Sequence, residues 1–84
     1  MKYLHAMIRV HDLDATSRFF TEGLGLHQTR RMDNDAGRFS LVYFGAPENP
    51  EAEIELTWNW PPEDGSPPEN YGGTRNFGHL AFAV

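Results

Sequence analysis

A proline- and glycine-rich stretch places the strongest constraint on how this chain can fold. Residues 61–73 contain four prolines and three glycines. Proline removes a backbone donor and interrupts helices and central strands, and clustered glycine is typical of turns, so we expect an irregular connector here. The sequence therefore predicts one folded unit before the connector and a short separate element after it.

Regular elements alternate with turn signals on both sides of this connector. Asp12 is a suitable N-cap for a helix over residues 13–23, which has an apolar stripe and ends at glycines. Turns are expected at residues 33–37 and 45–50. An order of β-α-β-β-β, connector and β is typical of an α+β domain with a mixed sheet. The predicted strands comprise residues 2–10, 26–31, 39–44, 52–60 and 77–84.

The composition excludes several classes of protein. A net charge of −5 over 84 residues argues against nonspecific nucleic-acid binding, which needs clustered Lys and Arg. No apolar run is long enough for a membrane span, and the first ten residues are too polar for a signal peptide. The chain has no cysteine, which excludes disulfides and thiolate metal sites. We therefore expect a cytoplasmic domain without nucleic-acid or membrane partners.

Three of the predicted strands repeat one polar pattern. Side chains four positions apart on a strand share a face and lie about 13 Å apart. On each of these strands one such side chain can bind a metal, and the other suits a polar or anionic group. The third pair shares a face if extended backbone begins by Arg75. The pairs are His5 with Arg9, Glu55 with Asn59, and His79 with Arg75.

The opposite faces of the same strands are apolar. We expect these faces to pack on the helix over residues 13–23, which would leave the polar faces to line a cavity. The apolar residues are Leu4, Ile8 and Val10 on the first strand, Ile54, Leu56 and Trp58 on the fourth, and Leu80, Phe82 and Val84 on the last.

Two imidazoles and a carboxylate are a common donor set for zinc, nickel or iron. The pattern therefore predicts a metal site, with the second group of each pair holding a long, charged or amide-rich ligand. Taken singly, each residue has an ordinary explanation as a surface charge or a hydrogen-bonded histidine. The recurrence on three strands favours the functional interpretation. His11 and His27 have no such periodicity and are interpreted as structural.

Several segments together resemble glyoxalase I, or lactoylglutathione lyase, of the vicinal oxygen chelate superfamily. Residues 19–25, FFTEGLG, are similar to the first helix of that family, and ELTWNW over residues 55–60 is the most specific match. The segments LHAMIRV over residues 4–10 and RNFGHL over residues 75–80 complete the resemblance. It implies the βαβββ module of the glyoxalase/bleomycin-resistance/dioxygenase fold.

The resemblance also implies a function. Glyoxalase I is a metal-dependent lyase that isomerises the hemithioacetal of glutathione and methylglyoxal to S-lactoylglutathione, in an active site shared by two subunits of a homodimer. Glu55 is the only carboxylate that we expect to lie close enough to accept a proton. The implied ligands of Zn²⁺ or Ni²⁺ are His5, Glu55 and His79. The implied substrate-binding residues are Arg9, Asn59 and Arg75 for glutathione, with Phe39 and Leu41 lining an apolar pocket near the reacting carbon.

That family has two βαβββ modules, and the second contributes a glutamate that is both a fourth ligand and the main base. We expect residues 1–60 to be the first module, residues 61–74 the connector, and residues 75–84 the first strand of a truncated second module. Such a chain is expected to dimerise and to have little activity by itself. One alternative is a non-catalytic binding module of the bleomycin-resistance type. Another is a different superfamily enzyme: a thiol transferase, an epimerase or a dioxygenase.

Overall fold

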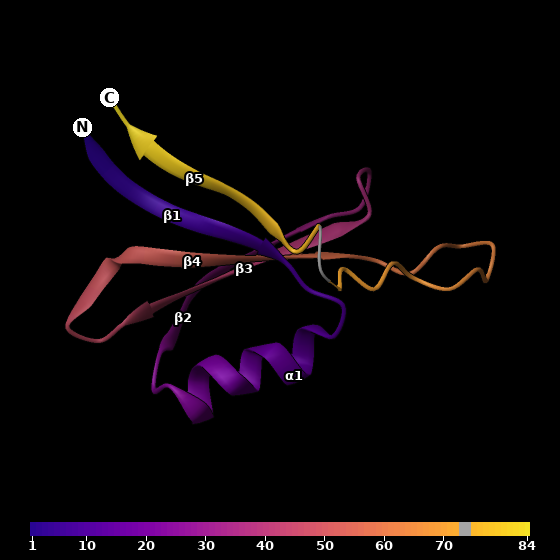
Figure 1. The fold of residues 1–84 in the computed structure, drawn as a ribbon, viewed down its shortest axis with the longest axis horizontal. Coiled ribbons are helices and arrows are strands. Elements are labelled where there is room, and N and C mark those ends of the chain that lie inside the picture. The colour runs from indigo at the N-terminus through magenta and orange to yellow at the C-terminus, as the bar shows by residue number, and fades with distance from the viewer. Residues whose placement is uncertain (73–74) are drawn as a thin grey trace.

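The computed structural model contains one mixed sheet with a helical segment against one of its faces (Figure 1). It describes residues 1–72 and 75–84, so connector residues 73 and 74 lie outside the described residues. The order of elements confirms the α+β prediction, with a β-α-β-β-β unit followed by one more strand. The elements are β1 (Lys2–Arg9), α1 (Leu13–Arg18), the π-helical turn η1 (Phe19–Gly23), β2 (His27–Asn34), β3 (Phe39–Ala46), β4 (Asn49–Asn59) and β5 (Phe77–Ala83).

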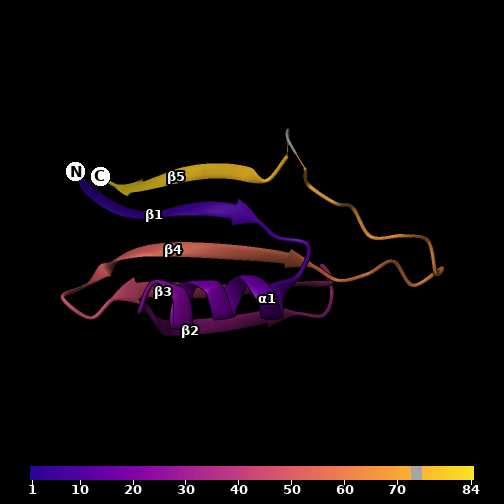
Figure 2. The same ribbon diagram turned by 60° about the horizontal axis from the view of Figure 1, so that its bottom comes forward.

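The five strands lie in the order β2-β3-β4-β1-β5. β1 runs parallel to β4, and the other neighbouring pairs are antiparallel. Figure 2 shows that the first and last strands of the chain lie side by side, with β4 next to them. The three strands with the repeated polar pattern are therefore direct neighbours.

The helical segment begins as the sequence predicts. The Asp12 side chain caps α1 by accepting a hydrogen bond from the backbone N–H of Ala15 at 3.0 Å. The single predicted helix is instead a short α-helix followed by a π turn, in which the N–H of Leu24 donates to the carbonyl of Phe19 five residues earlier. Among the described residues, neither helical element has the length or apolarity needed to cross a membrane.

The hydrophobic core lies between the helical segment and the centre of the sheet. Phe20 stacks on Phe44 at 5.8 Å between ring centroids. The partly buried side chains of Ile8, Ile54 and Trp58 pack against this core, which confirms the predicted packing for β4 and for the second half of β1. The buried members of the cluster are Val10, Leu13, Phe20, Val42, Phe44 and Leu56.

The apolar face of β5 does not pack on the helix, so that part of the prediction is wrong. Leu80 and Phe82 remain 56% and 49% exposed, and Val84 is fully exposed. The cause is the strand order, because β5 lies at the edge beyond β1 while the helical segment packs over β3 and β4 (Figure 1). Leu4, near the start of β1, is also only partly covered.

Both predicted turns are shorter than expected. β2 extends to Asn34, whose side-chain oxygen accepts a hydrogen bond from the N–H of Gly37 and so closes the turn into β3. The second connection is also tight, because Ala46 of β3 already pairs with Asn49 of β4.

Candidate metal-binding site

The face of the sheet opposite the helix carries a row of side chains across all five strands. Met7 of β1 is paired with Glu55 on one side and with His79 on the other. Glu55 is paired in turn with Tyr43 of β3, and Tyr43 with Arg30 of β2. Residues directly opposite each other in neighbouring strands share a face, so this row brings Glu55 and His79 together.

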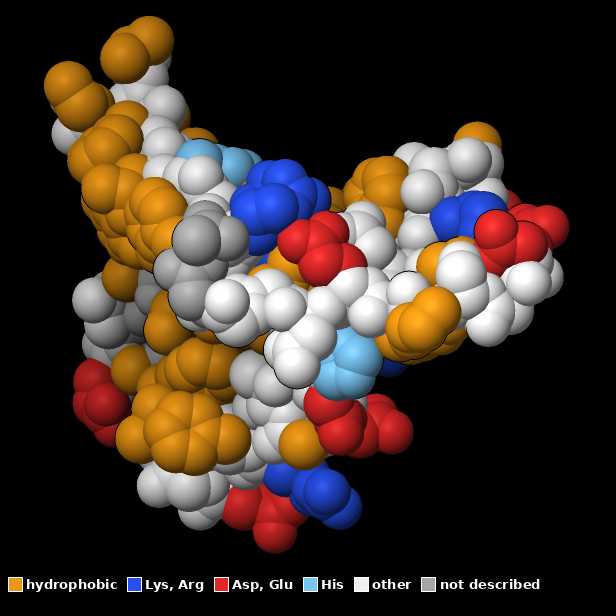
Figure 3. Space-filling model, turned by 45° about the vertical axis from the view of Figure 1, so that its right-hand side comes forward, with side chains coloured by type: hydrophobic (Ala, Val, Ile, Leu, Met, Phe, Trp, Pro, Cys, Tyr) orange, Lys and Arg blue, Asp and Glu red, His pale blue; other side chains and the backbone are white. Residues whose placement is uncertain are grey.

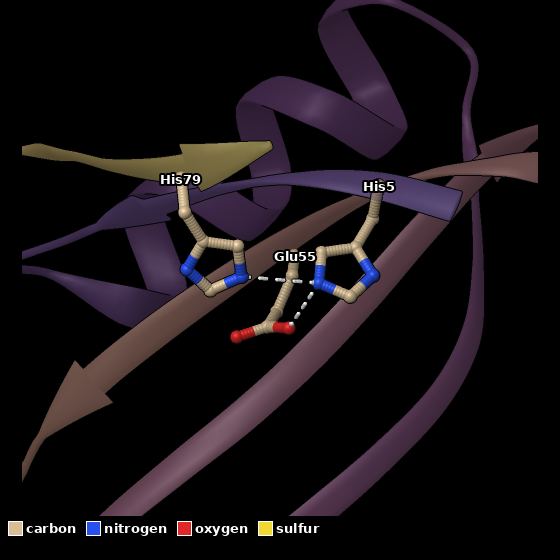
Figure 4. A group of neighbouring side chains, drawn as sticks. All are labelled: His5, Glu55 and His79. Atoms are coloured by element: carbon tan, nitrogen blue, oxygen red, sulfur yellow. Dashed lines mark hydrogen bonds and ion pairs between the residues drawn. The ribbon is translucent and has the colours of Figure 1, made fainter. Parts of the chain in front are cut away.

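The side chain of His5, two residues before Met7, completes a cluster of three metal-binding groups (Figure 4). His5 Nε2 lies 3.0 Å from Glu55 Oε1 and 3.3 Å from His79 Nε2. One ligand atom from each residue lies within 4.8 Å of the others. Glu55 is buried, His5 is half-buried and His79 is exposed, so the cluster is open on the side of β5.

A β-bulge directs His79 toward this cluster. Phe77 pairs with Ile8 and His79 with Met7, so Gly78 is an extra residue in β5. The bulge changes the alternation of β5 just before His79. The strand also begins at Phe77 rather than by Arg75, so the condition under which Arg75 and His79 would share a strand face is not met.

Two neighbours act on the Glu55 carboxylate. The hydroxyl of Thr57 donates to Glu55 Oε2 at 3.1 Å, which leaves Oε1 facing His5. Tyr43 lies directly opposite Glu55 in the β3–β4 register, which places its phenol beside the same carboxylate. Burial and this contact with Glu55 raise the pKa of Tyr43 to about 12, so the phenol stays protonated at neutral pH.

The geometry and chemistry of the cluster fit a divalent metal ion. Two ligand atoms at about 2.0–2.1 Å from zinc, at a tetrahedral angle, are about 3.3 Å apart. The separations of 3.0 and 3.3 Å around His5 Nε2 are close to that value. Two imidazole nitrogens and a carboxylate oxygen are donors that zinc and nickel both accept.

The residues predicted to bind the substrate's tail lie where β1 and β4 meet the connector. Arg9 Nη1 donates to the carbonyl oxygens of Arg75 and Phe77 at 3.1 and 3.3 Å. Asn59 donates to the Tyr71 hydroxyl at 2.9 Å. A hollow of about 390 Å³ borders Arg9 and Tyr71 at this end of the sheet. Figure 3 shows pale blue histidine, blue basic and red acidic side chains next to one another on one face of the molecule.

Arg75 itself is engaged by the connector rather than by the metal cluster. Its Nε lies 2.6 Å from a carboxylate oxygen of Glu69. Phe39 and Leu41 of β3 are paired with Asn59 and Thr57 of β4, so they lie on the same face as Glu55. The predicted apolar lining is therefore next to the predicted polar ligands.

Sequence reasoning missed several residues around the cluster. Tyr43 and Thr57 could have been found by alternation, because each lies two positions from an assigned site residue. Tyr71, only 8% exposed, lies in the connector and has no periodic signal. Glu53 is a second carboxylate beside His5, because the two residues are partners in the β1–β4 register. The expectation that Glu55 is the only nearby carboxylate is therefore wrong.

Glu53 is nevertheless engaged by β2. Although burial would raise the pKa of the Glu53 carboxyl, hydrogen bonds from Thr29 and Arg30 outweigh it and lower that pKa below its usual range. Arg30 Nη2 lies 3.1 Å from Glu53 Oε1.

Comparisons with known proteins agree with this fold. The model of the Glyoxalase/Bleomycin resistance protein/Dioxygenase superfamily matches residues 2–84. The whole chain is 39% identical to the lactoylglutathione lyase of Salmonella typhimurium and to a probable lactoylglutathione lyase of Synechocystis. The trypanothione-dependent glyoxalase I of Leishmania major is similar in structure, with a TM-score of 0.66 and 35% identity over 87% of this chain and 52% of that one.

The chain spans 58% and 60% of the length of the two bacterial relatives. The match to the family model, by contrast, covers almost every residue of the chain itself. The chain therefore belongs to the Glyoxalase/Bleomycin resistance protein/Dioxygenase superfamily.

Proposed function

We propose that this chain forms part of a lactoylglutathione lyase, which isomerises the hemithioacetal of methylglyoxal and glutathione to S-lactoylglutathione and so detoxifies methylglyoxal. The observation that carries the proposal is the convergence of His5, Glu55 and His79 on one point of the sheet face. Relatives named lactoylglutathione lyase match the whole of this chain, which supports the same reaction class.

In this proposal His5, Glu55 and His79 hold Zn²⁺ or Ni²⁺. A bound divalent metal would supply Lewis acidity, which polarises substrate oxygens and makes the adjacent C–H bond more acidic. The buried Glu55 carboxylate accepts the proton from that carbon. Thr57 keeps one carboxylate oxygen occupied, so the carboxylate is held in one orientation before the substrate arrives.

The glutathione part of the substrate binds at the connector end of the same face. Arg9, Asn59 and Arg75 supply two guanidinium groups and an amide, which suit carboxylates and peptide groups. Their present partners are carbonyl, hydroxyl and carboxylate groups of the chain, and a bound tail would replace some of these. Phe39 and Leu41 cover the apolar part of the substrate near the reacting carbon.

The assembly around this site is also part of the proposal. We assign residues 1–60 to a first βαβββ module, residues 61–74 to a connector and residues 75–84 to the first strand of a second module. Two subunits share the active site in a cytoplasmic homodimer. The half-exposed apolar side chains of Leu80 and Phe82 support an arrangement in which β5 is covered by further protein.

The direct test is metal binding by the purified chain. Wild-type protein should bind Zn²⁺ or Ni²⁺ stoichiometrically, and a His5→Ala, His79→Ala double variant should lose it because one donor alone remains. His27→Ala, which removes an exposed histidine of β2, is the matched control. Full metal occupancy in the double variant would refute the proposed ligand set.

The test of the substrate class is the binding of an S-alkyl glutathione, measured by calorimetry. Arg9→Ala should weaken binding by about 2–4 kcal/mol without changing metal content, because a charged hydrogen-bonding partner of the tail is lost. Arg31→Ala on β2 is the control. Equal affinities in wild type and Arg9→Ala would contradict the tail-binding role, and metal binding without glutathione binding would favour another superfamily enzyme.

A further inference from the structure

One tyrosine connects the candidate metal ligands to the charged edge of the sheet. Tyr43 of β3 is 7% exposed and lies on the row that crosses all five strands. Its direct neighbours in that row are Glu55 on β4 and Arg30 on β2. Tyr43 therefore lies next to the metal cluster on its buried side, and the other tyrosines lie outside this row.

Tyr43 contacts two of the three candidate ligands. Its ring meets the His5 imidazole edge to face, with 5.7 Å between ring centroids and 76° between the planes. It also lies directly opposite Glu55 in the β3–β4 register, close enough for that carboxylate to raise the pKa of the Tyr43 hydroxyl, while the Glu55 oxygens contact His5 and Thr57. One side chain therefore restricts both the imidazole and the carboxylate.

The position of Tyr43 is itself fixed from β2. The Arg30 guanidinium carbon lies 3.8 Å from the centroid of the Tyr43 ring, a cation–π contact. Glu53 and Thr29 hold Arg30 in place through an ion pair and a hydrogen bond to the shared carboxylate. The Glu53 side chain is 15% exposed and that of Arg30 is 58% exposed, so the ion pair is shielded from water mainly at its carboxylate end.

We propose that Tyr43 is a positioning residue of the metal site, which holds the Glu55 carboxylate and the His5 imidazole in the arrangement that a divalent cation requires. The inference rests on the proposed metal-binding function and adds a role that the three ligands alone do not imply. Groups that orient metal ligands through hydrogen bonds contribute about 10–100-fold to metal affinity. Without Tyr43, the Glu55 side chain keeps only Thr57 and His5 as fixed partners.

The test compares Tyr43→Phe with Tyr3→Phe in the full chain, with Co²⁺ as the probe. Tyr43→Phe removes only the hydroxyl and keeps the ring, so the core packing is retained. Tyr3→Phe removes the same group from a residue that packs on Phe82 and is 38% exposed. We expect Tyr43→Phe to weaken Co²⁺ binding about 10-fold and to change the visible spectrum of the bound ion, with Tyr3→Phe unchanged in both.

The outcomes separate this inference from the proposed function. If wild-type protein binds Co²⁺ and Tyr43→Phe has the same affinity and spectrum, the positioning role is refuted and the metal site stands. If wild-type protein does not bind Co²⁺, the proposed metal function fails.

In that case metal-free crystal structures still decide the positioning role, because Glu55 should occupy one conformer in wild type and several in Tyr43→Phe. An unchanged, single Glu55 conformer in the variant would overturn the inference.

Discussion

The two edges of the sheet differ in chemistry although both face solvent. β2 (His27–Asn34) carries Arg30, Arg31 and Asp33, and nearly all of its residues are exposed. β5 (Phe77–Ala83) has no acidic or basic side chain other than His79, and its exposed residues include Phe77, Leu80 and Phe82. One edge is polar, and the other is apolar.

This difference indicates which edge strand is suited to exposure to solvent. Charged side chains along an edge strand prevent other strands from pairing with it, and β2 has them. Its charges are also engaged, in the ion pairs Arg30–Glu53 and Arg31–Asp33. β5 lacks such protection, and it carries His79, one of the three candidate ligands. The candidate site therefore depends on the edge strand that lacks protecting charged side chains.

Gly78→Ala should have the largest effect, because it disturbs the contact of β5 with β1. A Cβ at Gly78 would lie 2.9 Å from the Met7 carbonyl oxygen and would also contact the Met7 thioether. Overpacking of this kind costs about 1–3 kcal/mol in the free energy of unfolding. Urea unfolding measures this loss, and hydrogen exchange should locate it in β5.

Gly72→Ala is the matched control for that variant. The atoms nearest a Cβ at Gly72 lie 3.8 and 3.9 Å away, so its stability should stay within about 0.5 kcal/mol of wild type. Equal unfolding curves for Gly78→Ala and wild type would show that β5 tolerates displacement, and the contrast between the two edges would then be unimportant for the site.

Leu80→Lys should have the next largest effect, on self-association. Leu80 is 56% exposed on the apolar edge, and burying a leucine in an interface contributes about 1.5–3 kcal/mol. A charge there should weaken dimerisation at least about 10-fold in sedimentation equilibrium. Met32→Lys, at a 45% exposed position on β2, should leave association unchanged. Equal effects of the two variants would show that β5 is no more an interface than β2.

Much of the fold follows from local patterns in the sequence. The alternation around Leu56 and the Asp12 N-cap predict elements that the structure contains, because each depends on neighbouring residues only. The covering of β5 could not be predicted in the same way. Alternation shows that a strand face is apolar, but the strand order decides whether a helix lies over it.

The candidate site, too, could be predicted only in part from local patterns in the sequence. The parity of His5 and Glu55 places each on a polar face, and the β1–β4 register then brings the two together. His79 reaches the cluster through a bulge at Gly78, which alternation alone does not predict. Tyr43 shares a strand face with two assigned residues, but its contacts with His5 and Glu55 depend on the register of three strands.

Asp33→Asn should have the smallest effect, because it tests one charge at the polar edge. Hydrogen bonds from Ser40 and then from Arg31 lower the pKa of the Asp33 carboxyl below its usual value of 3.8. A carboxyl whose pKa is lower in the folded state contributes stability above pH 3.8, and that stability is lost as the pH falls through the folded value.

The buried Ser40 hydroxyl also accepts a hydrogen bond from the Trp60 indole at 2.9 Å, so Trp60 fluorescence can follow unfolding near this group. Asparagine keeps an acceptor for Ser40 but does not titrate, so the stability of the variant should fall less steeply than that of wild type below pH 3.8. Parallel stability curves in that range would mean that the charge of Asp33 does not stabilise β2. The charges of the polar edge would then prevent pairing with other strands because they are exposed, and not because they form ion pairs.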